Sequence, residues 1–234
     1  MRLNSFVKVF PLLALGFVLP SQGTTIVASG AGALPGTAED LTGDTPTEIT
    51  GSIPDTIDPL LGVNMFKIDI VDPLDFSAIT TTSSSGITDT ELFLFDSSGN
   101  GVYANDDLGG SDPTTFSLAC LPSADASNPC LSSRPFGVGP TSAGIYYLAI
   151  TRSSNMPTTG GNEIFSILNS TDVVGPSISG AVDGWDGGAF TSDDPDLVNY
   201  DIVLTGTVPE PATTAVIGAA GLLLVFLRRK LPVR

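Results

Sequence analysis

The sequence predicts an all-β fold, a β-sandwich or jelly roll, with a signal helix before it and a single transmembrane helix after it. Three observations predict the β domain. Short segments rich in Thr, Ile, Val, Phe and Tyr recur along the chain, as in half-buried strands. Clusters of Gly, Pro, Asn, Asp and Ser separate these segments. Between the two ends, no window has apolar residues at helical spacing.

Composition divides the 234-residue chain into four parts. Residues 1–23 are predicted as a signal peptide, 24–44 as a linker, 45–206 as the β domain with an insertion near 112–140, and 207–234 as a tail with a membrane helix at 212–227. The β domain is long enough to bury a core of its own. Its expected strands are Glu48–Ile53, Asn64–Ile70, Phe76–Thr81, Thr90–Phe95, Val102–Asn105, Gly144–Thr151, Glu163–Leu168 and Val198–Leu204.

Charge and composition exclude several functions. All 25 acidic residues lie between Glu39 and Glu210, where only Lys67, Arg134 and Arg152 are basic. So acidic a domain repels nucleic acid, because phosphate binding needs Lys and Arg. The chain has no histidine, which excludes Ser-His and Cys-His nucleophile pairs. The acidic surface either binds cations or keeps the domain soluble.

The N-terminus has the order of a secretion signal. Arg2 and Lys8 precede an apolar run that Pro20 ends, and small residues follow. The run is too short for an ordinary membrane span. We expect cleavage near Gly23, with Ala28 as the second choice.

The C-terminus predicts a membrane segment. Residues 212–227 carry no charge, and Arg228, Arg229 and Lys230 follow at once. As a helix these sixteen residues would measure about 24 Å, which snorkelling arginines can extend toward a full span. The basic cluster marks the cytoplasmic side, so the β domain would lie outside the cytoplasm.

This tail resembles the PEP-CTERM sorting signal of Gram-negative bacteria, with the motif Pro209-Glu210-Pro211, the glycine-containing apolar segment and the cluster Arg228-Arg229-Lys230. The resemblance implies that an integral membrane exosortase recognises the tag and removes it. It also implies an association with exopolysaccharide. The expected location is the cell envelope or surface, or the extracellular space after processing, with the C-terminal tip cytoplasmic before processing.

A second resemblance covers roughly residues 45–152. The segments that carry it are Asn64–Ile68, Asp89–Asp96, Asn105–Asp107 and Gly144–Ile150. They look like the bacterial pre-peptidase C-terminal domain, a secreted β-sandwich that often holds calcium. The chain departs from that pattern around Cys120–Cys130 and from residue 153 to 200, and it carries no peptidase beside the domain.

One loop resembles the first half of a calcium-binding loop. In Asp96-Ser97-Ser98-Gly99-Asn100-Gly101, oxygen ligands stand at positions 1, 3 and 5, and Gly follows at position 6. Without flanking helices it is not an EF-hand, and the same residues also make ordinary hairpin turns. Asn100-Gly101 is expected to supply the tight turn. If a calcium ion binds, the expected ligands are Asp89, Asp96, Ser98, Asn100, Asp106 and Asp107.

Two further features are expected to be structural or ligand-binding. Trp185, between Asp183 and Asp186, is either a platform for a sugar ring or part of a plain Gly/Asp loop. Cys120 and Cys130 are the only cysteines. In an exported protein they predict a disulfide, the alternative being two buried thiols.

Three functions remain open at this point. The first is a structural or binding β-sandwich of the envelope or exopolysaccharide. The second is a calcium-dependent carbohydrate-binding module that uses Trp185 and the Asp loops. The third is a carboxylate-based hydrolase, for which no motif singles out a catalytic pair. The expectation is that the protein is not an enzyme.

Overall fold

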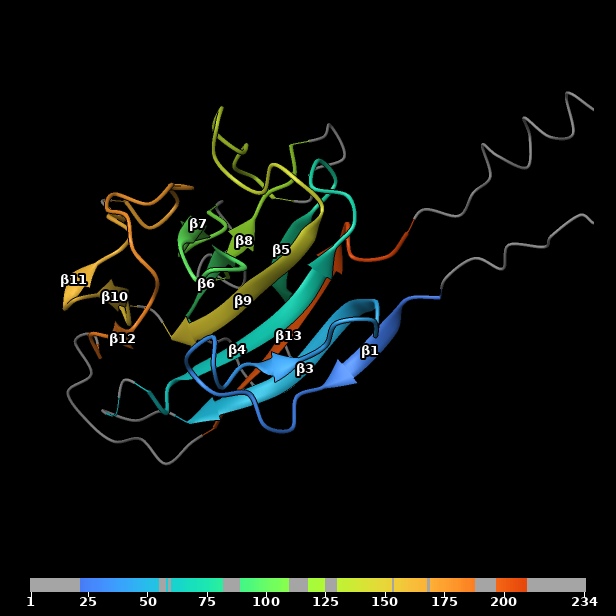
Figure 1. The fold of residues 1–234 in the computed structure, drawn as a ribbon, viewed down its shortest axis with the longest axis horizontal. Helices are drawn as coiled ribbons and strands as arrows, with labels where there is room; N and C mark the ends of the chain where they lie inside the picture. Colours follow the sequence, from blue (N-terminus) through green and yellow to red (C-terminus); the bar gives the residue numbers. More distant parts are fainter. Residues whose placement is uncertain are drawn as a thin grey trace, which may run out of the picture. The chain divides into compact units, whose positions relative to one another are not determined.

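The structure is a computed structural model of the chain, and it describes residues 22–54, 58, 60–81, 89–109, 118–124, 130–152, 154–167, 169–187 and 197–209. Every helix or strand in these ranges is a β-strand, which confirms the all-β prediction. Residues Ser21–Pro209 group into one compact unit (Figure 1). The predicted signal helix and the predicted membrane helix lie outside the described residues. Within the described ranges, no helix is long and apolar enough to span a bilayer.

Two five-stranded sheets form the body. The first has the strand order β1-β3-β13-β5-β8, and the second has the order β2-β4-β9-β6-β7. The strands of the first sheet are β1 (Thr24–Val27), β3 (Pro46–Pro54), β5 (Ser77–Thr81), β8 (Cys120–Leu121) and β13 (Leu197–Thr205). Those of the second are β2 (Glu39–Asp40), β4 (Val63–Ile70), β6 (Thr90–Asp96), β7 (Gly101–Asn105) and β9 (Gly144–Arg152).

The main core lies between these two sheets, in a sandwich-like arrangement. Ile49 and Ile202 of the first sheet belong to the same buried cluster as Phe66, Ile68 and Leu148 of the second. The alternation seen in β4 explains this packing, because every second side chain of a strand points to the same face. Burying these apolar faces is the main favourable term of folding.

A second core covers the outer face of the second sheet. A small sheet with the order β11-β10-β12 lies beside it, made of β10 (Pro157–Thr159), β11 (Asn162–Glu163) and β12 (Gly184–Trp185) (Figure 1). On that face, Phe93, Phe95 and Met65 are buried by side chains that include Ile164, Phe165 and Trp185. The strand β6 is therefore buried on both faces, which explains its near-continuous apolar sequence.

The segment predicted as a linker belongs to the fold instead. β1 pairs with β3 in parallel, and β2 pairs with β4 in parallel, so residues 24–44 add one edge strand to each sheet. Thr25 Oγ1 donates a hydrogen bond to Glu48 Oε2 at 2.8 Å, and Ile26 packs against the main core. The prediction missed these strands because two- and four-residue segments are too short to show a period.

Two local predictions were wrong. The β6–β7 hairpin turns at Gly99, which has a φ of 84°, and not at Asn100-Gly101. The Gly99 N–H donates to Asp96 O at 2.9 Å, as in a turn whose last residue is left-handed. Of the predicted strand Glu163–Leu168, the described residues 163–167 are mostly irregular: only Glu163 belongs to a strand, β11, and Phe165 forms an isolated bridge. Ile164 and Phe165 are buried in the second core and do not pair in a ladder.

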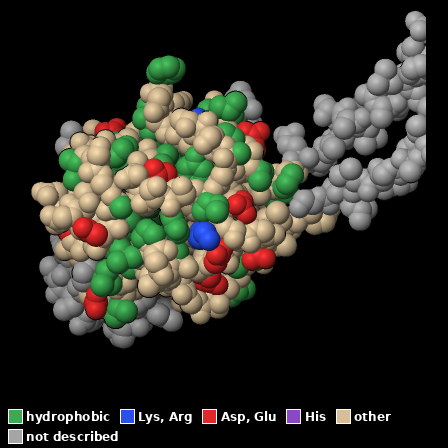
Figure 2. Space-filling model, in the orientation of Figure 1, with side chains coloured by type: hydrophobic (Ala, Val, Ile, Leu, Met, Phe, Trp, Pro, Cys, Tyr) green, Lys and Arg blue, Asp and Glu red, His purple; other side chains and the backbone are tan. Residues whose placement is uncertain are grey.

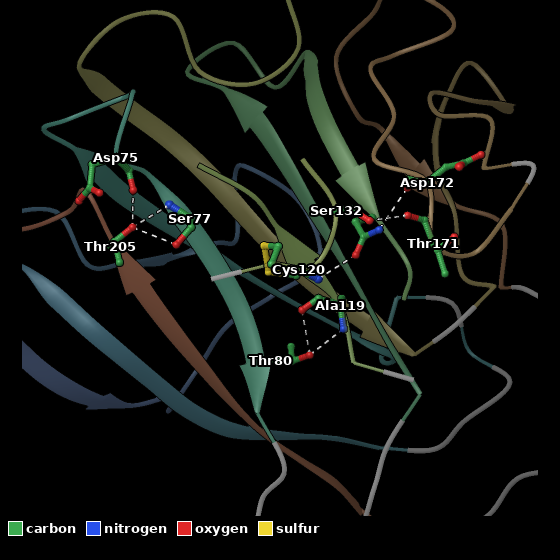
Figure 3. The surroundings of a disulfide bond; sticks show 11 residues. Asp75, Ser77, Thr80, Ala119, Cys120, Ser132, Thr171, Asp172 and Thr205 are labelled. Atoms are coloured by element: carbon green, nitrogen blue, oxygen red, sulfur yellow. Dashed lines mark hydrogen bonds between the residues drawn. A yellow bond between two sulfur atoms is a disulfide. The ribbon is translucent and has the colours of Figure 1, made fainter. Parts of the chain in front are cut away.

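The disulfide prediction is confirmed. Cys120 and Cys130 are bonded, with Cα atoms 5.7 Å apart, within the usual range. Figure 3 shows that Ala119, beside Cys120, is held against β5: Thr80 Oγ1 accepts from Ala119 N at 2.8 Å and donates to Ala119 O at 3.2 Å. The region predicted as an insertion thus supplies β8, a short strand of the first sheet.

Candidate metal site

Three of the six predicted calcium ligands meet at one end of the β6–β7 hairpin. Asp89 lies directly before β6, and Asp106 and Asp107 follow β7. Because Leu92 pairs with Asn105, the start of one strand lies beside the end of the other. One carboxylate oxygen of each aspartate lies within 4.8 Å of the others. Two oxygens bound to one Ca²⁺ at 2.3–2.6 Å lie at most about 5 Å apart, so this spacing suits a shared cation.

A fourth acidic group, Glu91, lies beside this cluster, and it is buried. Only 2% of Glu91 is exposed, and its Oε2 atom has no hydrogen-bond partner. Burial raises the pKa of Glu91 well above its usual range, and the nearby carboxylate of Asp106 raises it further. Asp89 also contributes, while the backbone N–H of Ser154 opposes the shift by a hydrogen bond. A buried acceptor without a donor is costly, so Glu91 fits a cation better than it fits an apolar core.

Burial also raises the pKa of Asp89, and the carboxylate of Asp107 adds to that shift. Desolvation is the larger of the two causes. Both effects disfavour the charged form. A divalent cation among these groups would outweigh both effects, because its charge favours the deprotonated carboxylates that bind it.

Hydrogen bonds to two neighbouring segments hold the end of β7 in place. Asn105, only 1% exposed, accepts from Cys120 N at 2.8 Å through Oδ1 and donates to Asp172 O at 3.1 Å through Nδ2. The Asp107 N–H donates to Ser170 O at 2.7 Å. Figure 3 shows Asp172 and Thr171 next to the segment after the disulfide, where Ser132 donates to Thr171 O. The backbone that carries Asp106 and Asp107 is therefore ordered by tertiary contacts.

The other three predicted ligands lie at the opposite end of the hairpin. Asp96 Oδ1 accepts from Ser98 N at 2.8 Å and from Asn100 N at 3.0 Å. Asn100 Nδ2 also donates to Asp96 Oδ2, at 3.0 Å. These bonds make Asp96 the cap of the turn. The length of β6, about 20 Å at 3.3 Å per residue, separates Asp96 from Asp89, so one ion cannot bind both groups.

Trp185 is a core residue and not a surface platform. It is 6% exposed, and its Nε1–H donates to Ala33 O at 2.8 Å. Its ring meets those of Phe93 and Phe95 edge-on, at centroid distances of 5.5 and 6.5 Å. No sugar can stack on a ring that the protein already covers. The neighbouring Asp183 and Asp186 accept hydrogen bonds from the backbone of Gly160 and Met156.

The sorting motif is described only at its first residue. Pro209 is exposed and is the last described residue of the chain. Glu210, Pro211 and the cluster Arg228-Arg229-Lys230 lie outside the described residues.

Sequence reasoning missed Glu91 as a member of the cluster. The signal was present in the segment Thr90-Glu91-Leu92-Phe93-Leu94-Phe95, where Glu91 shares the face of Phe93 and Phe95. A carboxylate on an apolar face needs a partner. The sequence alone does not show that this face is covered, because the residues that cover it, such as Phe165 and Trp185, come much later in the chain.

Comparison with known proteins gives no information on what this site binds. No family model matches the chain, and no curated protein matches it.

Proposed function

We propose that this protein is an exported, non-enzymatic β-sandwich of the cell envelope or the extracellular matrix, stabilised by a calcium ion at the end of the β6–β7 hairpin. The ion would be held by Asp89, Asp106 and Asp107, with Glu91 at the buried side. The signal-like N-terminus and the tail support the location, and the acidic cluster supports the ion. The resemblance of the tail supports processing by an exosortase and an association with exopolysaccharide.

The observation that carries the calcium proposal is the buried carboxylate of Glu91 beside three converging aspartates. Like charges brought together in a partly buried site repel each other, and Glu91 Oε2 has no donor to offset its burial. All the groups are oxygen ligands, which Ca²⁺ and Mg²⁺ prefer. Calcium fits better than magnesium, because it tolerates irregular geometry whereas Mg²⁺ demands an octahedron and keeps its waters.

The two observations that suggested a calcium-dependent carbohydrate-binding module find no support in the structure. That hypothesis depended on Trp185 and on calcium ligands in the Asp96 loop. Trp185 is buried, and Asp96 caps a turn. The structural or binding role in the envelope is therefore the function we propose.

Thermal unfolding with and without calcium tests the site. A ligand that binds only the folded state stabilises by RT ln(1 + [L]/Kd), about 2.7 kcal/mol at a hundredfold excess over Kd. We expect the melting temperature of the protein to rise by several degrees in millimolar calcium relative to chelator, and to rise less in magnesium. Asp107→Ala should abolish most of the rise.

Asp96→Ala is the matched control. It removes an aspartate from the same hairpin, so it lowers the baseline stability by the loss of a turn cap, but it should leave the calcium-dependent rise intact. Sodium chloride at matched ionic strength controls for general screening. The site does not exist if sodium reproduces the whole rise, or if the Asp107 and Asp96 variants respond to calcium alike.

A further inference from the structure

A separate layer of the chain covers the outer face of the second sheet. We call this layer, described at residues 154–167 and 169–187, the outer layer. Trp185 of the outer layer packs edge-on against Phe93 of β6, with ring centroids 5.5 Å apart. Glu91 belongs to the same face of β6 as Phe93, because every second side chain of a strand points to the same side. The outer layer therefore covers the sheet face to which Glu91 belongs.

The two ends of the outer layer are joined to each other, at a place that we call its root. Met156 N donates a hydrogen bond to Asp186 Oδ1 at 2.9 Å, and Asp186 N donates to Met156 O at 3.0 Å. Gly187 N donates to Oδ1 of the buried Asn155 at 3.0 Å. These hydrogen bonds lie within the layer, so they are not lost if the layer separates from the sheet.

The outer layer is attached at two places to the segments that carry the acidic cluster. At the root, the backbone N–H of Ser154 donates a hydrogen bond to Glu91. Ser154 has a φ of 71°, a left-handed conformation that few residues other than glycine adopt. Further along the layer, Ser170 O accepts a hydrogen bond from Asp107 N at 2.7 Å. The candidate metal site thus lies where the outer layer is fastened to the β6–β7 hairpin.

Closing the outer layer without a cation is unfavourable for Glu91. Its Oε2 atom is buried and has no hydrogen-bond donor among the described residues. The charged groups that act most strongly on Glu91 are acidic: Asp106 and Asp89 at the hairpin, and Asp186 at the root of the layer. Figure 2 shows that Asp and Glu side chains are much commoner than Lys and Arg on the drawn face, so the protein has few cations of its own to offset this cluster. Opening the layer returns Glu91 to water, which removes the cost of its burial.

We propose that calcium fastens the outer layer to the sandwich: the layer is closed when the ion is bound, and it opens before the sandwich unfolds when calcium is removed. This inference rests on the proposed calcium site and assigns that site a regulatory role. A ligand shifts an equilibrium between two states only through its different affinities for them. Calcium meets this condition, because the closed layer holds the backbone of Asp107 in place and covers Glu91. For an ion that binds only the closed state, a hundredfold excess over Kd shifts the equilibrium about a hundredfold toward closure.

A single tryptophan makes the outer layer observable by itself. Trp185 is the only tryptophan of the chain, and its side chain is buried in contact with β6. Thermal unfolding of the full chain, kept in solution by a mild detergent, is followed by Trp185 fluorescence and by far-ultraviolet circular dichroism, which reports the strands. In chelator, we expect the fluorescence transition several degrees below the dichroism transition. In millimolar calcium, both transitions should coincide at a higher temperature, as in two-state unfolding.

The variants Asp186→Asn and Asp183→Asn form a matched pair. Both aspartates lie next to β12, and each accepts a backbone hydrogen bond, from Met156 N and Gly160 N respectively. Asparagine can accept the same bond through its Oδ1 atom. Of the two aspartates, Asp186 is the one that acts on Glu91, so Asp186→Asn should narrow the gap between the two transitions in chelator. Asp183→Asn should leave the gap as in the wild type, and an equal effect of both variants would contradict the proposal.

The same curves distinguish failure of this inference from failure of the calcium site. If calcium raises the dichroism midpoint but the two transitions already coincide in chelator, the site stands and its control of the outer layer is wrong. Transitions that stay apart in calcium would also overturn that control, because the bound ion would not hold the layer closed. If calcium moves neither transition, the calcium site is wrong and the inference is wrong with it.

Discussion

At the scale of single residues, Glu91 and Asp96 show how position decides the role of a carboxylate. Asp96 is surrounded by donors, because the N–H groups of Ser98 and Asn100 converge on its Oδ1 atom. Glu91 has an oxygen without a donor, and three aspartates lie near it, Asp106, Asp89 and Asp186. The N–H groups of the turn therefore stabilise Asp96 as an anion. Glu91 lacks such a donor at its Oε2 atom, so it needs either a bound proton or a cation.

The structure brings together three of the six predicted ligands, for a reason that lies in strand geometry. The sequence predicted a hairpin, and a hairpin does bring Asp89 to Asp106 and Asp107. The same hairpin holds Asp96 at its far end, because β6 is seven residues long. The spacing of residues along the chain predicted that Asp96 and Asp107 share one calcium loop. The register of β6 and β7, which the spacing does not reveal, places these two residues at opposite ends of the hairpin.

The protonation of Glu91 predicts how the metal-free protein responds to pH. The folded state raises the pKa of Glu91, so as pH rises above its ordinary pKa the unfolded chain loses the proton while the folded chain keeps it. In chelator, the free energy of unfolding should therefore fall as pH rises above the ordinary pKa of a glutamate. Glu91→Gln should remove most of this fall and stabilise the metal-free protein at neutral pH by about 1–3 kcal/mol. Urea unfolding at a series of pH values checks this.

The same variant in calcium provides the control. Glu91→Gln keeps the shape of the side chain but loses its charge, so the stabilisation by calcium should shrink while the metal-free protein becomes more stable. An unchanged pH dependence in the variant would show that Glu91 is not the group that titrates.

At the scale of elements, long strands were predictable and short ones were not. β3, β4, β5, β6, β7, β9 and β13 each have an apolar pattern long enough to read, and their predicted bounds agree with the structure to within two residues. The short strands β1, β2, β8, β10, β11 and β12 carry no such pattern. These short strands form because they pair with the edge of a longer strand or pack on an apolar face of a sheet. Whether such a short segment becomes a strand depends on tertiary contacts, which a single sequence does not show.

The disulfide is the element-scale feature with the clearest consequence for stability. It joins the start of β8 to residue 130 across a separation of ten residues, and β8 holds Asn105 next to the candidate metal site. Replacing both Cys120 and Cys130 by serine should lower the free energy of unfolding by about 2–3 kcal/mol. Thermal unfolding measures the loss, and non-reducing mass spectrometry of the wild-type protein should show the crosslink. Quantitative alkylation of both thiols without reductant would contradict the assignment.

At the scale of the whole molecule, the first and the last strands of the described body begin and end next to the same residues, Thr45 and Pro46. Thr24 N donates to Thr45 O at 3.2 Å, and Thr207 Oγ1 donates to Pro46 O. Removing the signal near Gly23 leaves β1 intact, whereas cleavage after Ala28 would delete it from the first sheet. The structure therefore favours the first of the two predicted cleavage positions. The hydrogen bonds that fasten the end of β13 lie at Gly206 and Thr207, before the proposed sorting motif.

The last prediction concerns that tail. In the native host, replacing Pro209, Glu210 and Pro211 by alanines should leave the fold unchanged, because the described body is fastened at Gly206 and Thr207, before the motif. If an exosortase reads the motif, the wild-type chain should be found shortened at its C-terminus, and the variant should keep its tail and stay in the membrane fraction. Intact-mass measurement of both proteins reports the two termini at once. The mature N-terminus should lie at or before Thr24 in each, which controls for normal export. Equal masses and equal fractionation of the variant and the wild type would show that the motif is not read, and the proposed sorting would then be wrong.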